Sequence, residues 1–244
     1  MIEASQQGRV LHLALNRPEK RNALNSSLCQ ALVEAFAQAG HDPSIGAIVL
    51  SGNGPSFCAG MDLKEALESE DDPFAELHER LFSILERTRK PILAAVHGTL
   101  AGGGVGLAAN AHIVIAAPDT KFGLTEIKIA LWPVLIFPSV ALAIGERKAT
   151  ELALTGRLFD AREAQQFGLV AEIAENPLAR AQALANEIAA YSPNALAKGL
   201  DYSRRIRRLT QEERAAAGRQ TRADLMSHPD FAKSVKQFFA KSSA

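Results

Sequence analysis

Apolar and polar residues follow two alternating rhythms along the first half of the chain. Strict alternation over Arg9–Leu15 predicts a strand, and apolar residues at helical spacing over Ser26–Gly40 predict a helix with a hydroxyl cap and a glycine stop. Later segments repeat this order of strand and helix. They are Ala47–Leu50, Ile92–Val96 and Ala111–Ala116, expected as buried strands, and Glu76–Arg89, expected as a helix. The alternation is typical of an α/β fold.

The second half of the chain has a different pattern. Helical spacing dominates after about residue 134, and Ser192-Pro193 interrupts it. The sequence beyond this point is charged and helical. We therefore expect a core over residues 1–190 and a helical region over residues 191–244.

Composition excludes several classes of protein. The 244 residues carry 27 Lys+Arg and 27 Asp+Glu, so a net charge of zero gives no general attraction to nucleic acid or to anionic membranes. Two cysteines, Cys29 and Cys58, cannot form a disulfide framework or a CxxC metal pair, which indicates a reducing, cytoplasmic location. The first residues resemble no signal peptide.

An uncharged stretch of 28 residues, Pro91–Pro118, raises the question of a membrane span. Five glycines fall in its middle, together with His97, Asn110 and His112, and this composition makes a poor continuous helix. A second uncharged run, Ile129–Gly145, is interrupted by two prolines. Both stretches are expected to form buried core.

Two glycine-containing segments follow predicted strands and run into short helices. They are Ser56–Lys64 and Val96–Leu107. Each would leave backbone N–H groups free at a helix N-terminus, where negative charge is favoured. Either segment alone could be a simple turn. Together they predict an oxyanion hole, in which two amides stabilise a developing negative charge.

Gly104–Ala109 also matches the GxGxxA pattern of dinucleotide-binding folds, with Glu126 about 20 residues further on. The next predicted strand begins near Ala111, which leaves too few residues for a parallel crossover helix. We therefore favour the oxyanion interpretation.

Several motifs in their expected order resemble the enoyl-CoA hydratase/isomerase (crotonase) superfamily. The matching stretches are Asn16–Pro18 with Asn22–Asn25, Phe57–Leu63, Ala94–Gly98 with Gly102–Gly104, Phe122–Glu126, and Leu154–Gly156 with Ala161, Ala164 and Gly168–Val170. The resemblance implies a spiral of β-β-α units whose C-terminal helices mediate trimerisation, giving a homotrimer or a dimer of trimers. It also implies an acyl-CoA thioester substrate, with coenzyme A as part of the substrate and no separate cofactor or metal.

The resemblance assigns roles to individual positions. The amides of Met61 and Gly103 would form the oxyanion hole, and Gly103 with the stretch Ala59, Gly60, Met61, Asp62 and Leu63 would line the coenzyme A site. The hydratases use two glutamates around a water. Glu126 stands at the second position, whereas Gly106 stands at the first.

Two further departures concern the acyl end of the pocket. Thr125 replaces the usual proline before Glu126, and Val134–Pro138 replaces a glycine-rich stretch. We therefore expect the acyl end of the pocket to be apolar and reshaped.

A single carboxylate suits a proton shuttle better than the addition of water. The first hypothesis is therefore the shift of a 3-enoyl double bond to the 2-position, with Glu126 as acid and base. One alternative is a 2-enoyl-CoA hydratase in which another acid, such as Asp62 or Glu65, replaces the missing one. Another is a degenerate relative that binds coenzyme A without catalysis.

Other candidate residues have simpler interpretations. Glu126 itself could be a surface glutamate paired with Lys121 or Lys128. Cys58 is expected to pack rather than act as a nucleophile, and His97 is expected to make a structural hydrogen bond. The basic cluster Arg204–Arg208 lacks interleaved aromatic residues, so we expect a solvated helix face, with contact to the phosphates of coenzyme A as the next alternative and nucleic acid least favoured.

Overall fold

The computed structural model describes residues 1–68 and 75–242, and its main feature is a six-stranded sheet. The strand order is β1-β2-β3-β4-β6-β9; β1 pairs antiparallel to β2, and every other neighbouring pair is parallel. The strands are β1 (Ile2–Gln7), β2 (Val10–Leu15), β3 (Ala47–Gly52), β4 (Ile92–Val96), β6 (Ile113–Ala116) and β9 (Glu172–Ile173).

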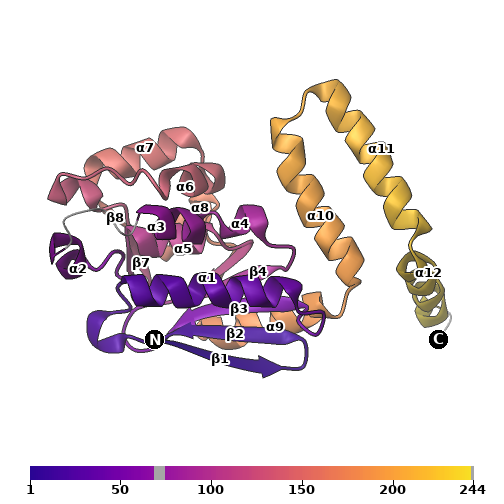
Figure 1. The fold of residues 1–244 in the computed structure, drawn as a ribbon, viewed down its shortest axis with the longest axis horizontal. Helices are drawn as coiled ribbons and strands as arrows, with labels where there is room; N and C mark the ends of the chain where they lie inside the picture. Colours follow the sequence, from indigo (N-terminus) through magenta and orange to yellow (C-terminus); the bar gives the residue numbers. More distant parts are fainter. Residues whose placement is uncertain (69–74, 243–244) are drawn as a thin grey trace.

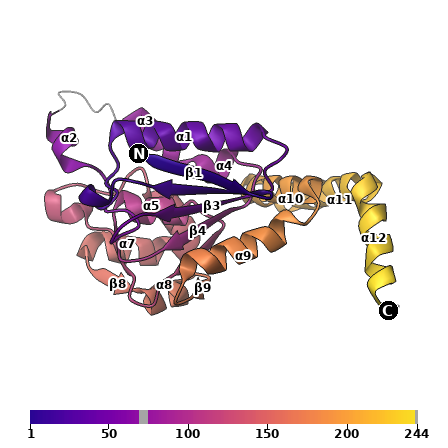
Figure 2. The same ribbon diagram turned by 90° about the horizontal axis from the view of Figure 1, so that it is seen from below.

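Both faces of this sheet are covered, which explains the uninterrupted apolar runs in its strands. In β3, Val49 faces the cluster formed with the alanines of α9 (Pro177–Ala189), whereas Ile48 and Leu50 face the larger core. Figure 2 shows α9 on one side of the sheet and α1 (Ser26–His41) on the other. The sheet is therefore a rigid layer from whose strand ends the functional loops leave.

A second, smaller sheet lies beyond the ends of these strands. It joins β5 (Thr99–Ala101), β7 (Lys121–Gly123) and β8 (Leu158–Asp160) in that order. Short helices surround it. They are α5 (Gly103–Ala109), the 3-10 helix η2 (Glu126–Ile129), α6 (Phe137–Ile144), α7 (Glu146–Thr155) and α8 (Ala161–Phe167).

The remaining short helices belong to the N-terminal half of the chain. They are the 3-10 helix η1 (Pro18–Lys20), α2 (Leu63–Glu68), α3 (Ala75–Phe82) and α4 (Ile84–Arg87). The α3 helix packs against both α1 and α5, and so joins the N-terminal helix to the glycine-rich segment.

The C-terminal helices stand apart from this core (Figure 1). They are α10 (Pro193–Arg205) with the 3-10 turn η3 (Ile206–Arg208), α11 (Gln211–Ser227) and α12 (Pro229–Ser242). Ala217 is the only buried residue of α11, and no residue of α10 is buried. Within the described residues, every helix is too short or too polar to span a bilayer.

The α/β fold class is confirmed, with corrections to element boundaries. The predicted helix over Glu76–Arg89 is wrong as a single element, because the chain turns at Ser83 between α3 and α4. The helix over Ser26–Gly40 is confirmed, but Asn25 is its cap: its side chain accepts from the amide of Leu28 at 3.0 Å. The helix also continues past Gly40 to His41.

Candidate active site

The first glycine segment holds the amide of Met61 in a defined direction. The Leu24 amide donates to the carbonyl of Gly60 at 2.7 Å, and the Asp62 amide donates to the carbonyl of Leu24 at 2.9 Å. No peptide bond among the described residues is cis. In a trans peptide the C=O and the following N–H point in opposite directions, so the N–H of Met61 points away from Leu24.

Asp62 is tied into the scaffold beside this amide. Its Oδ2 lies 3.1 Å from Nη2 of Arg17, and Nη1 of the same guanidinium donates to the Ala23 carbonyl at 2.6 Å. Burial pushes the pKa of Asp62 upward, but hydrogen bonds from Arg17 and from the amides of Glu65 and Lys64 outweigh it and lower the pKa. Asp62 therefore caps α2 as a carboxylate.

The second segment presents the N-terminus of α5. Gly102 adopts φ 47° as the residue before this helix, and its amide donates to the Gly123 carbonyl of β7 at 2.9 Å. The carbonyl of Gly102 accepts from the amide of Gly106 at 3.1 Å along the helix. The N–H of Gly103 therefore points outward from the helix start, where no intrahelical acceptor exists.

The two segments touch at their glycines. A Cβ built on Gly60 would lie 2.6 Å from the carbonyl oxygen of Ala101 and 3.3 Å from the nitrogen of Gly103. Gly60 also has φ 91°, a conformation that side chains rarely adopt. Only glycine permits this close approach, which brings the Met61 and Gly103 peptides into neighbouring positions.

Glu126 lies against the second segment. It is the first residue of η2, and its Oε1 would be 2.8 Å from a Cβ built on Gly102. Its Oε2 is buried and has no hydrogen-bond partner among the described residues. Burial raises the pKa of this carboxyl, against a smaller opposing effect of its own backbone. The alternative of a surface ion pair with Lys121 or Lys128 does not match this buried oxygen.

The position expected to carry a second acid is closed by apolar side chains. A Cβ built on Gly106 would lie 2.8 Å from the Cβ of Ile136, still closer to its Cγ2, and 3.1 Å from Phe82. The ring of Phe82 also approaches Gly103, at 3.2 Å from a Cβ built there. Ile136 belongs to the stretch Val134–Pro138 and is the buried apolar side chain that this stretch places beside position 106, whereas Val134 and Leu135 are exposed.

Comparisons with known proteins agree with this arrangement. A sequence model of the enoyl-CoA hydratase/isomerase family matches residues 5–244. The chain belongs to the enoyl-CoA hydratase/isomerase (crotonase) family.

Two relatives and a solved structure illustrate the range of this family. The 2,3-dehydroadipyl-CoA hydratase of Escherichia coli is 34% identical over 97% of this chain and 94% of its own. The human mitochondrial Delta(3,5)-Delta(2,4)-dienoyl-CoA isomerase is 36% identical over 79% of this chain and 64% of its own. The crystal structure of a Mycobacterium smegmatis enoyl-CoA hydratase superimposes with a TM-score of 0.91 at 30% identity, covering 98% of this chain and 96% of its own. The relatives thus include both hydratases and an isomerase, and the chain is an enzyme of this superfamily.

Asp62 and Glu65, the two candidates for a substitute second acid, both have partners near helix starts. Asp62 is paired with Arg17. Both carboxylate oxygens of Glu65 lie 3.4 Å from the amide of Ser26, at the N-terminus of α1. Each of these carboxylates therefore supports a helix start.

The cysteine and histidine candidates have structural environments. Cys58 is fully buried, and burial raises the pKa of its thiol to about 12, so the reactive thiolate is absent near neutral pH. The ring of His97 lies 2.9 Å from the Gly54 carbonyl, as expected for a structural hydrogen bond. Burial and the nearby charge of Arg204 lower the pKa of His112 to about 4, so its imidazole stays neutral.

The basic cluster is mostly solvated, as the sequence predicts, because Arg205, Arg207 and Arg208 are exposed and only Arg204 is half-buried. Three of its side chains also contact the segment around α4. Arg208 lies 2.9 Å from Glu86, and Arg207 lies 3.9 Å from the same carboxylate. Arg204 donates to the Thr88 carbonyl. These contacts attach η3 to α4, and the end of α10 to Thr88 just after α4.

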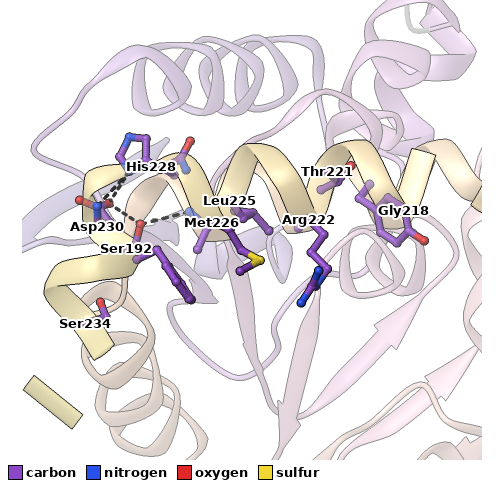
Figure 3. A pocket seen from close by; sticks show the side chains of 14 residues that line it. Ser192, Gly218, Thr221, Arg222, Leu225, Met226, His228, Asp230 and Ser234 are labelled. Carbon is purple, nitrogen blue, oxygen red and sulfur yellow. Dashed lines mark hydrogen bonds and ion pairs between the residues drawn. The ribbon is translucent and has the colours of Figure 1, made fainter. Parts of the chain in front are cut away.

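A cavity of about 570 Å³ lies elsewhere, between α10, α11 and α12. Figure 3 shows Ser192, His228 and Asp230 gathered at one end of it. Asp230 lies between the other two: its carboxylate accepts from Ser192 and is 3.5 Å from Nδ1 of His228. A nucleophilic serine needs the histidine next to its hydroxyl, so this trio joins helix ends and is no catalytic triad.

Sequence reasoning missed two residues that shape the site, Phe82 and Arg17. Phe82 follows His78 by one helical turn on the buried side of α3, a spacing typical of any core helix. Arg17 lies within a recognised motif, but its contact with Asp62 spans 45 residues of sequence. Neither contact has a signal in a single sequence.

Proposed function

We propose that this enzyme shifts the double bond of a 3-enoyl-CoA to the 2-position, with Glu126 as its acid and base. The observation that carries the proposal is the asymmetry around α5. A buried carboxylate oxygen without a partner lies beside Gly102, and one turn further along Ile136 fills the space next to Gly106. One acid and one apolar wall suit proton transfer between two carbons of the same substrate.

In the proposed reaction each part of the site would have one role. The amides of Met61 and Gly103 would bind the thioester oxygen, and the stretch Ala59–Leu63 would line the coenzyme A site. Glu126 would take the proton from C2, and the electrons of the C–H bond would form a dienolate whose charge rests on that oxygen. Returning the proton to C4 moves the double bond from C3–C4 to C2–C3. The raised pKa of Glu126 brings it nearer the value at which one group both takes and returns a proton well.

We also propose that residues 191–244 serve oligomerisation, as a homotrimer or a dimer of trimers. Large apolar side chains remain exposed on the described part of this region, and exposed apolar patches mark interaction surfaces. They are Tyr191, Met226, Phe231, Phe238 and Phe239.

The test compares the wild-type protein with Glu126→Gln on 3-enoyl-CoA and 2-enoyl-CoA. We expect the wild type to shift the bond of 3-enoyl-CoA, and the variant to be slower by about 10²–10⁴-fold, the usual contribution of one general acid–base group. The rate of the wild type should fall as the pH drops through the raised pKa of Glu126, because protonation removes the base.

Hydration of 2-enoyl-CoA is the second candidate function, because the Escherichia coli and Mycobacterium smegmatis relatives are named as hydratases. Rapid hydration by the wild type without any bond shift would establish it and overturn the isomerase proposal. Tight acyl-CoA binding with no turnover across a varied thioester panel would instead indicate a degenerate binding protein.

A further inference from the structure

Ile136 closes the site at a point where the backbone leaves it little freedom. Its side chain is 3% exposed, and it is the N-cap residue of α6. Its amide donates to the Pro133 carbonyl at 3.1 Å, and its carbonyl accepts from the amide of Val140 at 3.0 Å. A side chain added at Gly106 therefore cannot push Ile136 aside without disturbing the start of α6.

The wall formed by Ile136 and Phe82 is continuous with the proposed oxyanion hole. Phe82 approaches both Gly103 and Gly106, and Leu24 lies 3.0 Å from a Cβ built on Gly103. The neighbouring polar side chain on this turn, Asn110, already donates to the Gly106 carbonyl and to Ser139. An ordered water needs two to four polar partners, so a wall of this composition gives it no place to bind.

We propose that Ile136 is the specificity-determining residue of this site. Its side chain occupies the space that an acid at position 106 would need, and it keeps water away from the substrate carbons that exchange a proton with Glu126. The inference rests on the proposed function, because it explains why a bound enoyl group would exchange a proton with Glu126 instead of adding water. The substrate class it selects is an enoyl thioester whose acyl carbons contact the apolar surface beside Gly106, one helical turn along α5 from the carboxylate.

The test rebuilds the missing acid together with the space that it needs. The variants are Gly106→Glu alone, Ile136→Gly alone, and the two combined. Glycine is accepted at an N-cap position, and glutamate is a better helix former than glycine inside α5. The matched control combines Gly106→Gln with Ile136→Gly, which has the same bulk without the acid.

We expect the double variant with glutamate to hydrate 2-enoyl-CoA about a hundredfold faster than the wild type, the lower end of the contribution of one acid–base group. The glutamine control and each single variant should stay near the wild-type rate. Circular dichroism and thermal unfolding of every variant show which of them are folded.

Two results would overturn the assignment to Ile136. One is a folded Gly106→Glu single variant that hydrates as fast as the double variant, because Ile136 would then block nothing. The other is a folded double variant that hydrates no faster than its glutamine control. If the wild type shifts no double bonds while the double variant gains hydration, the proposed function fails and the role of Ile136 stands.

A second pair of variants keeps the proposal testable if the double variant does not fold. Ile136→Ser introduces a hydroxyl and a favourable N-cap, whereas Ile136→Ala leaves an apolar gap that should stay dry. During turnover of 3-enoyl-CoA in D₂O, the serine variant should incorporate several-fold more deuterium into the product than the wild type or the alanine variant. Equal incorporation in all three would overturn the proposal.

Discussion

The two glycine segments meet at the same place, but different interactions hold them there. The first depends on a charged contact, in which Arg17 binds Asp62 and the pKa of that carboxyl is lowered. The second depends on close backbone packing, and the carboxyl beside it, Glu126, has a buried oxygen without a partner and a raised pKa. The comparison shows that one fold can bind one acid into its scaffold and leave another buried, with one oxygen unpartnered and a raised pKa.

The largest effect is expected where the second segment is packed most tightly. A Cβ on Gly104 would lie 2.9 Å from the carbonyl carbon of Cys58 and closer still to its oxygen, and backbone atoms cannot rotate away. Gly104→Ala should therefore lower the free energy of unfolding by about 1–3 kcal/mol or more, as overpacking does. Urea denaturation measures this.

Gly199→Ala is the matched control for this substitution. It also lies in a helix, α10, and a Cβ built on it meets no atom within 4 Å. Alanine in a helix interior is favoured over glycine by about 0.5–1 kcal/mol, so this variant should be slightly stabilised. A Gly104→Ala protein as stable as the wild type would show that the second segment is not held by packing.

An intermediate effect is expected in the first segment. Asp62→Asn keeps a capping side chain but removes the charge that binds Arg17 and lies at the N-terminus of α2, which should cost about 1 kcal/mol near neutral pH. Because the folded-state pKa of Asp62 is lowered, this stability is present above the unfolded pKa and is lost as the pH falls through the folded one. Unfolding free energies of both proteins measured across acidic pH should therefore converge.

A surface ion pair nearby provides the control for this loss. Lys64 and Glu68 lie 3.8 Å apart, but both side chains are mostly exposed, at 80% and 66%. Glu68→Gln should change the free energy of unfolding little, because exposed pairs contribute about 0–1 kcal/mol. Equal losses in Asp62→Asn and Glu68→Gln would mean that the contact with Arg17 adds nothing beyond surface charge.

Structural elements that depend only on neighbouring residues could be predicted from the sequence. The glycine segments and the strands that precede them each depend on local spacing. Glu126 was found through its motif, and the structure places it against Gly102.

Contacts between distant segments could not be predicted in the same way. The closure of position 106 joins α5 to Ile136 and to Phe82 of α3, and no periodicity encodes which core residues meet. The strand β1 was also missed, because only Ile2 among its residues is partly buried, so its composition lacks an apolar face. The break between α3 and α4 is not predicted because only one residue, Ser83, separates the two helices, and the apolar pattern continues on both sides of it.

The smallest effect is expected at Glu126, and its sign is opposite to that at Asp62. Burial raises the folded-state pKa of Glu126, so its stabilising contribution is present below the unfolded pKa and is lost as the pH rises through the folded one. Near neutral pH the buried charge lacks a partner at Oε2, and Glu126→Gln should therefore raise the melting temperature slightly while it slows turnover. In acid well below the ordinary glutamate pKa of about 4.3, where both side chains are neutral, the difference should disappear. Thermal unfolding of both proteins across this pH range measures it; a lower melting temperature for the variant at neutral pH would show that Glu126, like Asp62, belongs to the scaffold.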